Sequence, residues 1–134
     1  MGQGLSDVAR LHARLHEEAA ALFRALDRED VLVYVPFSRF LDSVDAHVRT
    51  DLTVGYHLFL HHSSESIRRV AQRVLQEQEA FPQAFESFLQ QWGSAGEMQL
   101  RSLAFRDELE TLVSQLLKRI RVEERLISML SHVA

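Results

Sequence analysis

Apolar residues recur three and four positions apart along most of the 134-residue chain, and this spacing constrains the fold more than any other feature of the sequence. It places the apolar side chains on one face of a helix. We therefore predict helices over about residues 5–26, 36–61, 67–92 and 99–131. With only two prolines and five glycines, the chain has few breaks, which favours a few long elements. The sequence predicts an all-α protein.

Four long helices with short connections bury their apolar faces most economically as an antiparallel, up-down-up-down four-helix bundle. A chain of 134 residues with 46% hydrophobic residues suits one core, so we expect residues 1–134 to form a single domain. Two local departures are expected. Residues 31–35 read as an extended stretch, and Pro82 should kink the third helix because it removes a backbone hydrogen bond.

Charge and composition exclude several function classes. The net charge of −4 gives no clustered cationic surface for nucleic acid or an anionic membrane. No apolar run approaches the roughly 18–20 residues that span a bilayer, and we expect a cytoplasmic protein. The chain has no cysteine, so it has no thiolate ligand or thiol nucleophile. Any bound metal must therefore use histidine and carboxylate side chains.

Polar residues interrupt each apolar stripe where the side chain should face the bundle axis. An ionisable group buried there must meet a partner, water or a metal ion. The interrupting residues are His12 in the first helix, His47 with Asp51 in the second, Gln78 beside Glu77 in the third, and Arg119 with Glu123 in the fourth.

Two of these positions show metal-ligand spacing. His47-Val-Arg-Thr-Asp51 presents an imidazole and a carboxylate one helical turn apart, as two ligands of one ion require. His12 and His16 are also four residues apart, with His12 on the stripe and His16 on its flank. Such pairs also occur as surface pairs or as hydrogen-bonded core histidines, so the spacing leaves both interpretations open.

The order of these motifs is similar to that of the hemerythrin-like, or HHE cation-binding, family. His47-Val-Arg-Thr-Asp51, followed by Tyr56, resembles the second-helix motif His-x-x-x-Glu that runs into Leu-Tyr-Pro, with Asp replacing Glu and His57 replacing Pro. The second half resembles a branch with a phenylalanine-rich third helix that ends in Trp and a last helix reading Arg-Ile-x-x-Glu-Glu. The matching residues are Phe81, Phe85, Phe88, Trp92, Phe105, Arg119, Ile120, Glu123 and Glu124.

The resemblance implies a non-haem iron centre, di-iron or mononuclear, that engages oxygen or nitric oxide. Two departures affect this expectation. Arg119 occupies the usual last-helix histidine position and cannot ligate a metal, and the third-helix histidine is missing, with Glu77 as a carboxylate substitute. The remaining candidate metal ligands are His12, His16, His47, Asp51, Glu77 and Glu123.

Two functions follow from this partly altered ligand set. One is a sensor or carrier of iron, oxygen or nitric oxide. The other is a metal-free regulatory or protein-interaction bundle, acting as a homodimer or with another protein, in which ion pairs of Arg119 with Asp51 and Glu123 replace the metal. An enzyme is not expected, because the sequence lacks the paired Glu-x-x-His motifs of di-iron oxidases and any Gly-rich phosphate motif.

Overall fold

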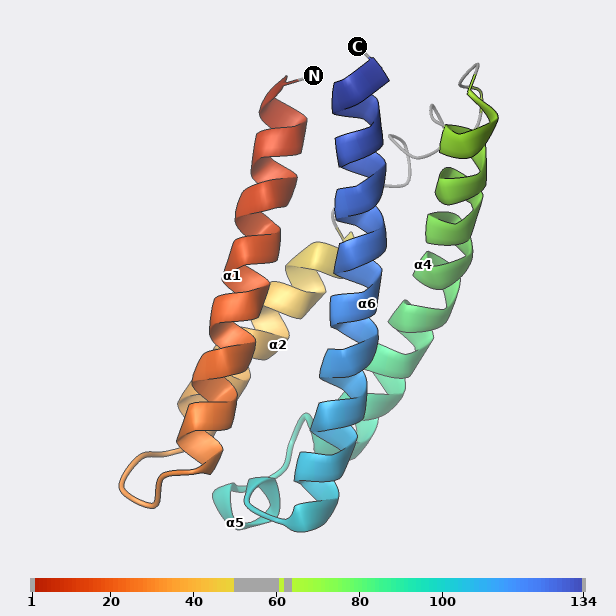
Figure 1. Cartoon of the computed structure of the whole chain (residues 1–134). Coiled ribbons are helices and arrows are strands. Elements are labelled where there is room, and N and C mark those ends of the chain that lie inside the picture. Colours follow the sequence, from red (N-terminus) through yellow and green to blue (C-terminus); the bar gives the residue numbers. More distant parts are fainter. Residues whose placement is uncertain (1, 50–60, 62–63, 134) are drawn as a thin grey trace.

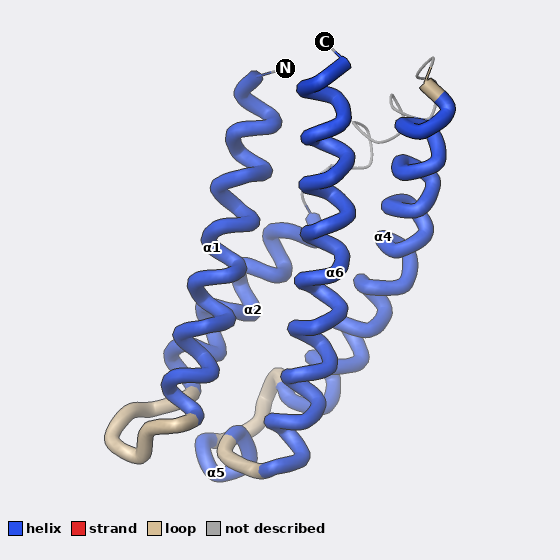
Figure 2. The backbone as a smooth tube through the Cα atoms, viewed as in Figure 1, coloured by secondary structure: helices blue, strands red, loops and turns tan. Residues whose placement is uncertain are grey.

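The computed structural model describes residues 2–49, 61 and 64–133, and this part of the chain is helical with short connections and contains no strand (Figure 2). The prediction of an all-α protein is confirmed. The helices are α1 (Gly2–Leu26), α2 (Tyr34–Arg49), α4 (Glu65–Trp92), α5 (Glu97–Leu100) and α6 (Leu103–Val133).

The long helices pack in two closely associated pairs. Helix α1 packs against α2, α4 packs against α6, and α1 also contacts α6, so that the pairs are joined along α1 and α6. In Figure 1, α1 and α4 run from top to bottom, whereas α2 and α6 run from bottom to top. The amino- and carboxyl-terminal ends of the described chain lie near each other at the top of this view.

The predicted apolar stripes form the core. One hydrophobic cluster takes residues from all five described helices and from the α1–α2 connection. Its aromatic centre joins three helices, because the ring of Phe105 in α6 lies 5.1 Å from that of Phe37 in α2 and 5.2 Å from that of Trp92 in α4. Phe88 contacts both Phe37 and Phe105. These offset and edge-to-face contacts are favourable beyond simple burial, and they fix the end of the molecule near α5.

The α1–α2 connection differs from the predicted extended stretch at residues 31–35. Helix α2 already begins at Tyr34, because the Glu97 carboxylate accepts hydrogen bonds from the backbone N–H groups of Val33 and Tyr34 at 2.5 and 3.0 Å. A carboxylate at this position satisfies N–H groups that have no partner inside the helix. Val33 is buried, whereas Leu32 and Val35 are exposed.

Other helix bounds differ less from the sequence-based prediction. The predicted fourth helix starts later than expected, at Leu103, because the short helix α5 and a turn precede it. The Ser102 hydroxyl accepts the backbone N–H of Phe105 and so caps the start of α6. Helix α4 continues through Pro82 to Trp92, and the kink there stays a prediction. The second helix is described as far as Arg49, and most of its predicted remainder, to residue 61, lies outside the described residues. None of the described helices is both long and apolar enough to cross a membrane.

Candidate metal centre

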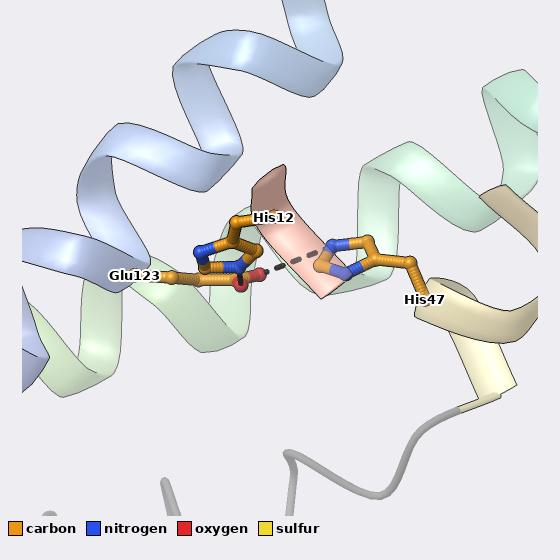
Figure 3. A group of neighbouring side chains, drawn as sticks. All are labelled: His12, His47 and Glu123. Atoms are coloured by element: carbon orange, nitrogen blue, oxygen red, sulfur yellow. Dashed lines mark hydrogen bonds and ion pairs between the residues drawn. The ribbon is translucent and has the colours of Figure 1, made fainter. Parts of the chain in front are cut away.

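Three helices each contribute one polar side chain to a shared interior cluster: His12 from α1, His47 from α2 and Glu123 from α6 (Figure 3). Each side chain is at most 2% exposed. His12 continues the stripe of Leu15, and Glu123 continues the stripe of Ile120, so the packing that buries these apolar residues also turns the polar ones inward.

The Glu123 carboxylate is the centre of this cluster. Its Oε2 lies 2.7 Å from His12 Nε2, and its Oε1 lies 3.4 Å from His47 Nε2. The two imidazole rings face each other edge to face, with their centroids 5.7 Å apart. Figure 3 shows both rings directed at the carboxylate from different sides. The cluster therefore links helices α1, α2 and α6 through one acidic side chain.

The electrostatics of the cluster favour the ionised carboxylate. Burial alone would raise the pKa of Glu123, but the hydrogen bond with His12, the 3.4 Å contact with His47 and the positive charge of Arg119 outweigh burial and lower the pKa from 4.5 to about 2. Glu123 is therefore an anion at neutral pH. An anionic carboxylate is the form that binds a metal cation.

Buried nitrogen atoms in the cluster lack hydrogen-bond partners among the described residues. They are Nδ1 and Nε2 of His47 and Nδ1 of His12, although the last lies 3.5 Å from Glu124 Oε1. A buried polar atom without a partner is costly, and in native proteins it usually meets water or an ion. His47 Nε2 lies 3.4 Å from Glu123 Oε1 without a hydrogen bond between them, and an ion between these side chains would bind both atoms.

The donor set fits a transition-metal ion. One ligand atom each from His12, His47 and Glu123 lies within 4.8 Å of the others, so small side-chain movements would bring all three to one ion. Two imidazoles and one carboxylate with open positions are typical of non-haem iron(II), and the same set occurs in zinc sites. An ion held in this way would act as a Lewis acid with room for a small ligand.

Arg119 is buried beside the same carboxylate. It is 4% exposed, and its Nε donates a hydrogen bond to Glu123 Oε1 at 3.1 Å. The guanidinium carbon lies 5.2 Å from the centre of the Phe81 ring in α4, a cation–π arrangement that holds the charged group in place. Arg119 therefore competes for the oxygen that a metal ion would also use.

Of the six predicted ligands, the structure brings His12, His47 and Glu123 together. His16 is exposed one turn beyond His12 and does not join the cluster. Asp51 lies outside the described residues, and Glu77 lies in α4 with a side chain that is also outside the described part. The predicted ion pair of Arg119 with Glu123 is present, whereas its pair with Asp51 falls on an undescribed residue.

A supporting contact between α1 and α2 was missed from the sequence. Ser43, fully buried one turn before His47, donates a hydrogen bond from its hydroxyl to Glu18 in α1. This contact holds α2 against α1 where His47 enters the cluster. The spacing of four residues between Ser43 and His47 was the signal that could have placed both side chains on one face.

Comparison with known proteins gave no relative. No protein-family model matches the chain, and no curated protein or solved structure matches it.

Proposed function

We propose that the chain is a hemerythrin-like, up-down-up-down four-helix bundle that binds a non-haem metal ion, iron in preference to zinc, and acts as a sensor or carrier of iron, oxygen or nitric oxide. His12, His47 and Glu123 would hold a single ion. Three ligands among the described residues suit a mononuclear site better than a di-iron site, because two irons require more protein ligands than three.

The observation that carries this proposal is the convergence of two imidazoles and a carboxylate from three helices in a buried cluster in which the His47 nitrogens make no hydrogen bond to a described residue. A purely structural cluster would satisfy its buried donors and acceptors internally. An ion between the rings and the carboxylate would bind one nitrogen of each imidazole. The motif resemblance to hemerythrin-like proteins supports iron as the ion and a diatomic gas as its ligand.

Metal analysis of protein expressed with added iron, and of chelated protein reloaded anaerobically with iron(II), tests the proposal. We expect close to one iron per chain. His12→Ala and His47→Ala should each lower iron binding at least tenfold, because the loss of one of three ligands leaves an incomplete site. Competition between iron(II) and zinc identifies the preferred ion.

His16→Ala is the matched control, because His16 is exposed on the same helix, one turn from His12. It should bind iron as the wild type does. Equal iron contents in wild type, His12→Ala and His47→Ala would contradict a site at this cluster, and a fall in His16→Ala as large as that in His12→Ala would contradict the ligand assignment.

The buried ion pair between Arg119 and Glu123 favours a second candidate function, a metal-free regulatory or interaction bundle. In that case the guanidinium takes the place of the cation. Arg119→Met distinguishes the two, because methionine keeps an apolar side chain of similar length but removes the charge. A metal site predicts that iron(II) restores the stability of Arg119→Met, since the ion compensates Glu123. A metal-free core predicts lower stability that no metal restores.

A further inference from the structure

A cavity of about 160 Å³ lies between α4 and α6, next to the metal-site cluster and outside its ligand set. Its lining residues are Ala80, Phe81 and Ala84 from α4, and Gln115, Lys118 and Arg119 from α6. Arg119 therefore belongs both to the cavity wall and to the ion pair with Glu123. The cavity joins an apolar wall on α4 to a polar and cationic wall on α6.

Arg119, in the wall of this cavity, has a donor without a hydrogen bond. Its Nε is used by Glu123, but the buried Nη1 makes no hydrogen bond to any described residue. The Phe81 ring, itself part of the cavity wall, lies 5.2 Å from the guanidinium carbon. A guanidinium that packs on an aromatic ring and has a donor without a partner can bind an oxygen anion. Carboxylates match its planar donor geometry particularly well.

The other walls favour an organic anion over a hydrated inorganic one. Ala80, Phe81 and Ala84 offer apolar surface that would cover a hydrocarbon body, whereas phosphate or sulfate would lose hydration against them without compensation. Lys118 and Gln115 are exposed, and they add a second positive charge and an amide at the same cavity. A dry cavity of roughly 150 Å³ accommodates a benzene ring, so the volume suits a body of about six carbons.

We infer that the α4–α6 cavity is a binding site for a small monocarboxylate with an apolar body, anchored by the Arg119 guanidinium. The carboxylate would accept a hydrogen bond from Nη1, which a small shift of the cavity wall must first uncover, while Nε stays paired with Glu123. The site goes beyond the proposed metal function and does not depend on it, because none of the three metal ligands lines the cavity.

Titration calorimetry of chelator-treated protein with benzoate tests the inference without any metal present. We expect one-to-one binding with a Kd below about 1 mM. Benzamide has the same ring but no charge, and it should bind at least tenfold more weakly. Equal affinity for benzoate and benzamide, or displacement of benzoate by equimolar phosphate, would overturn the assignment of an apolar carboxylate site.

Two variants locate the site. Ala84→Leu adds side-chain volume to the cavity wall without changing any charge, and it should abolish benzoate binding. Ala104→Leu makes the same change at an exposed position of α6 away from the cavity and should leave binding unchanged. Arg119→Lys keeps the charge but loses the planar donor fork, and we expect at least tenfold weaker binding.

The folded state of each variant is checked by its circular dichroism and unfolding midpoint. Should Arg119→Lys not fold, Ala84→Leu alone decides the question, and undiminished benzoate binding by Ala84→Leu would refute the cavity as the site. Absence of benzoate binding with normal iron binding would reject this inference and leave the proposed metal function intact. Normal benzoate binding with no iron binding would reject the proposed metal function and leave this inference intact.

Discussion

Glu123 contacts buried polar side chains from three helices. It is fully buried, and its two oxygens meet His12, His47 and Arg119. An isolated carboxylate in this position would be strongly destabilising, and its neighbours compensate this cost. Removing the charge of Glu123 therefore affects the stability of the protein even without a metal ion.

Glu123→Gln should lower the free energy of unfolding of the chelated protein by about 3 kcal/mol, because it leaves the Arg119 cation buried without a counter-ion. Urea denaturation measures this change. The control is Glu124→Gln, the next residue on α6, whose side chain is 55% exposed and for which we expect a change within about 0.5 kcal/mol. Equal effects of the two substitutions would show that the buried ion pair contributes nothing specific.

Glu123 also gives the metal-free protein an acid-dependent stability. The pKa of Glu123 is about 2 in the folded chain, against an ordinary value of 4.5 that applies to the unfolded chain. Between pH 2 and pH 4.5 the unfolded chain therefore binds more protons than the folded chain. The stabilising contribution of Glu123 is complete above about pH 4.5 and is lost as the pH falls toward 2. Unfolding free energies measured from pH 6 to 2 should therefore fall more steeply in wild type than in Glu123→Gln. Parallel curves would contradict the lowered pKa.

Helix α5 is a four-residue element that holds two longer segments in place. Glu97 receives the first N–H groups of α2, and Arg101, directly after α5, donates a hydrogen bond to the Val31 carbonyl at 2.5 Å. These contacts join segments more than sixty residues apart in the chain. They fix the start of α2 and, with it, the helix that carries His47.

Glu97→Gln should destabilise the protein by about 1 kcal/mol, because an amide accepts these N–H groups less strongly than a carboxylate does. The expected signal is a lower urea midpoint with an unchanged slope. Met98→Gln is the control on the same short helix, since Met98 is 89% exposed and should leave the midpoint unchanged. A midpoint for Glu97→Gln equal to that of wild type would mean that the α2 cap contributes no net stability.

At the scale of the whole molecule, the apolar periodicity was sufficient to predict the helical class and most of the core. The polar interruptions at His12, His47, Arg119 and Glu123 correctly indicated buried positions. His16 was placed on the flank of the apolar stripe but kept as a candidate ligand, because two residues four apart differ little in helical phase and the packing of α1 decides which one is buried. The short helix α5 has too few residues to produce a periodic signal.

Metal binding should stabilise the folded chain as a whole, because the three proposed ligands come from α1, α2 and α6. At a free iron(II) concentration 100 times the Kd, the expected gain is about 2.7 kcal/mol. Anaerobic thermal unfolding over a range of iron(II) concentrations measures it. His47→Ala should show no such concentration-dependent rise in its unfolding midpoint, and a rise equal to that of wild type would place the binding elsewhere.

The 111 positions that separate His12 from Glu123 also bear on how the cluster forms in a cell. At a synthesis rate of roughly 5–20 residues per second, the ribosome adds Glu123 on the order of ten seconds after His12. During the later part of that interval the nascent chain holds both histidines of the cluster and lacks their shared carboxylate. The ion proposed for this cluster would therefore find all three donors only after the last helix has docked.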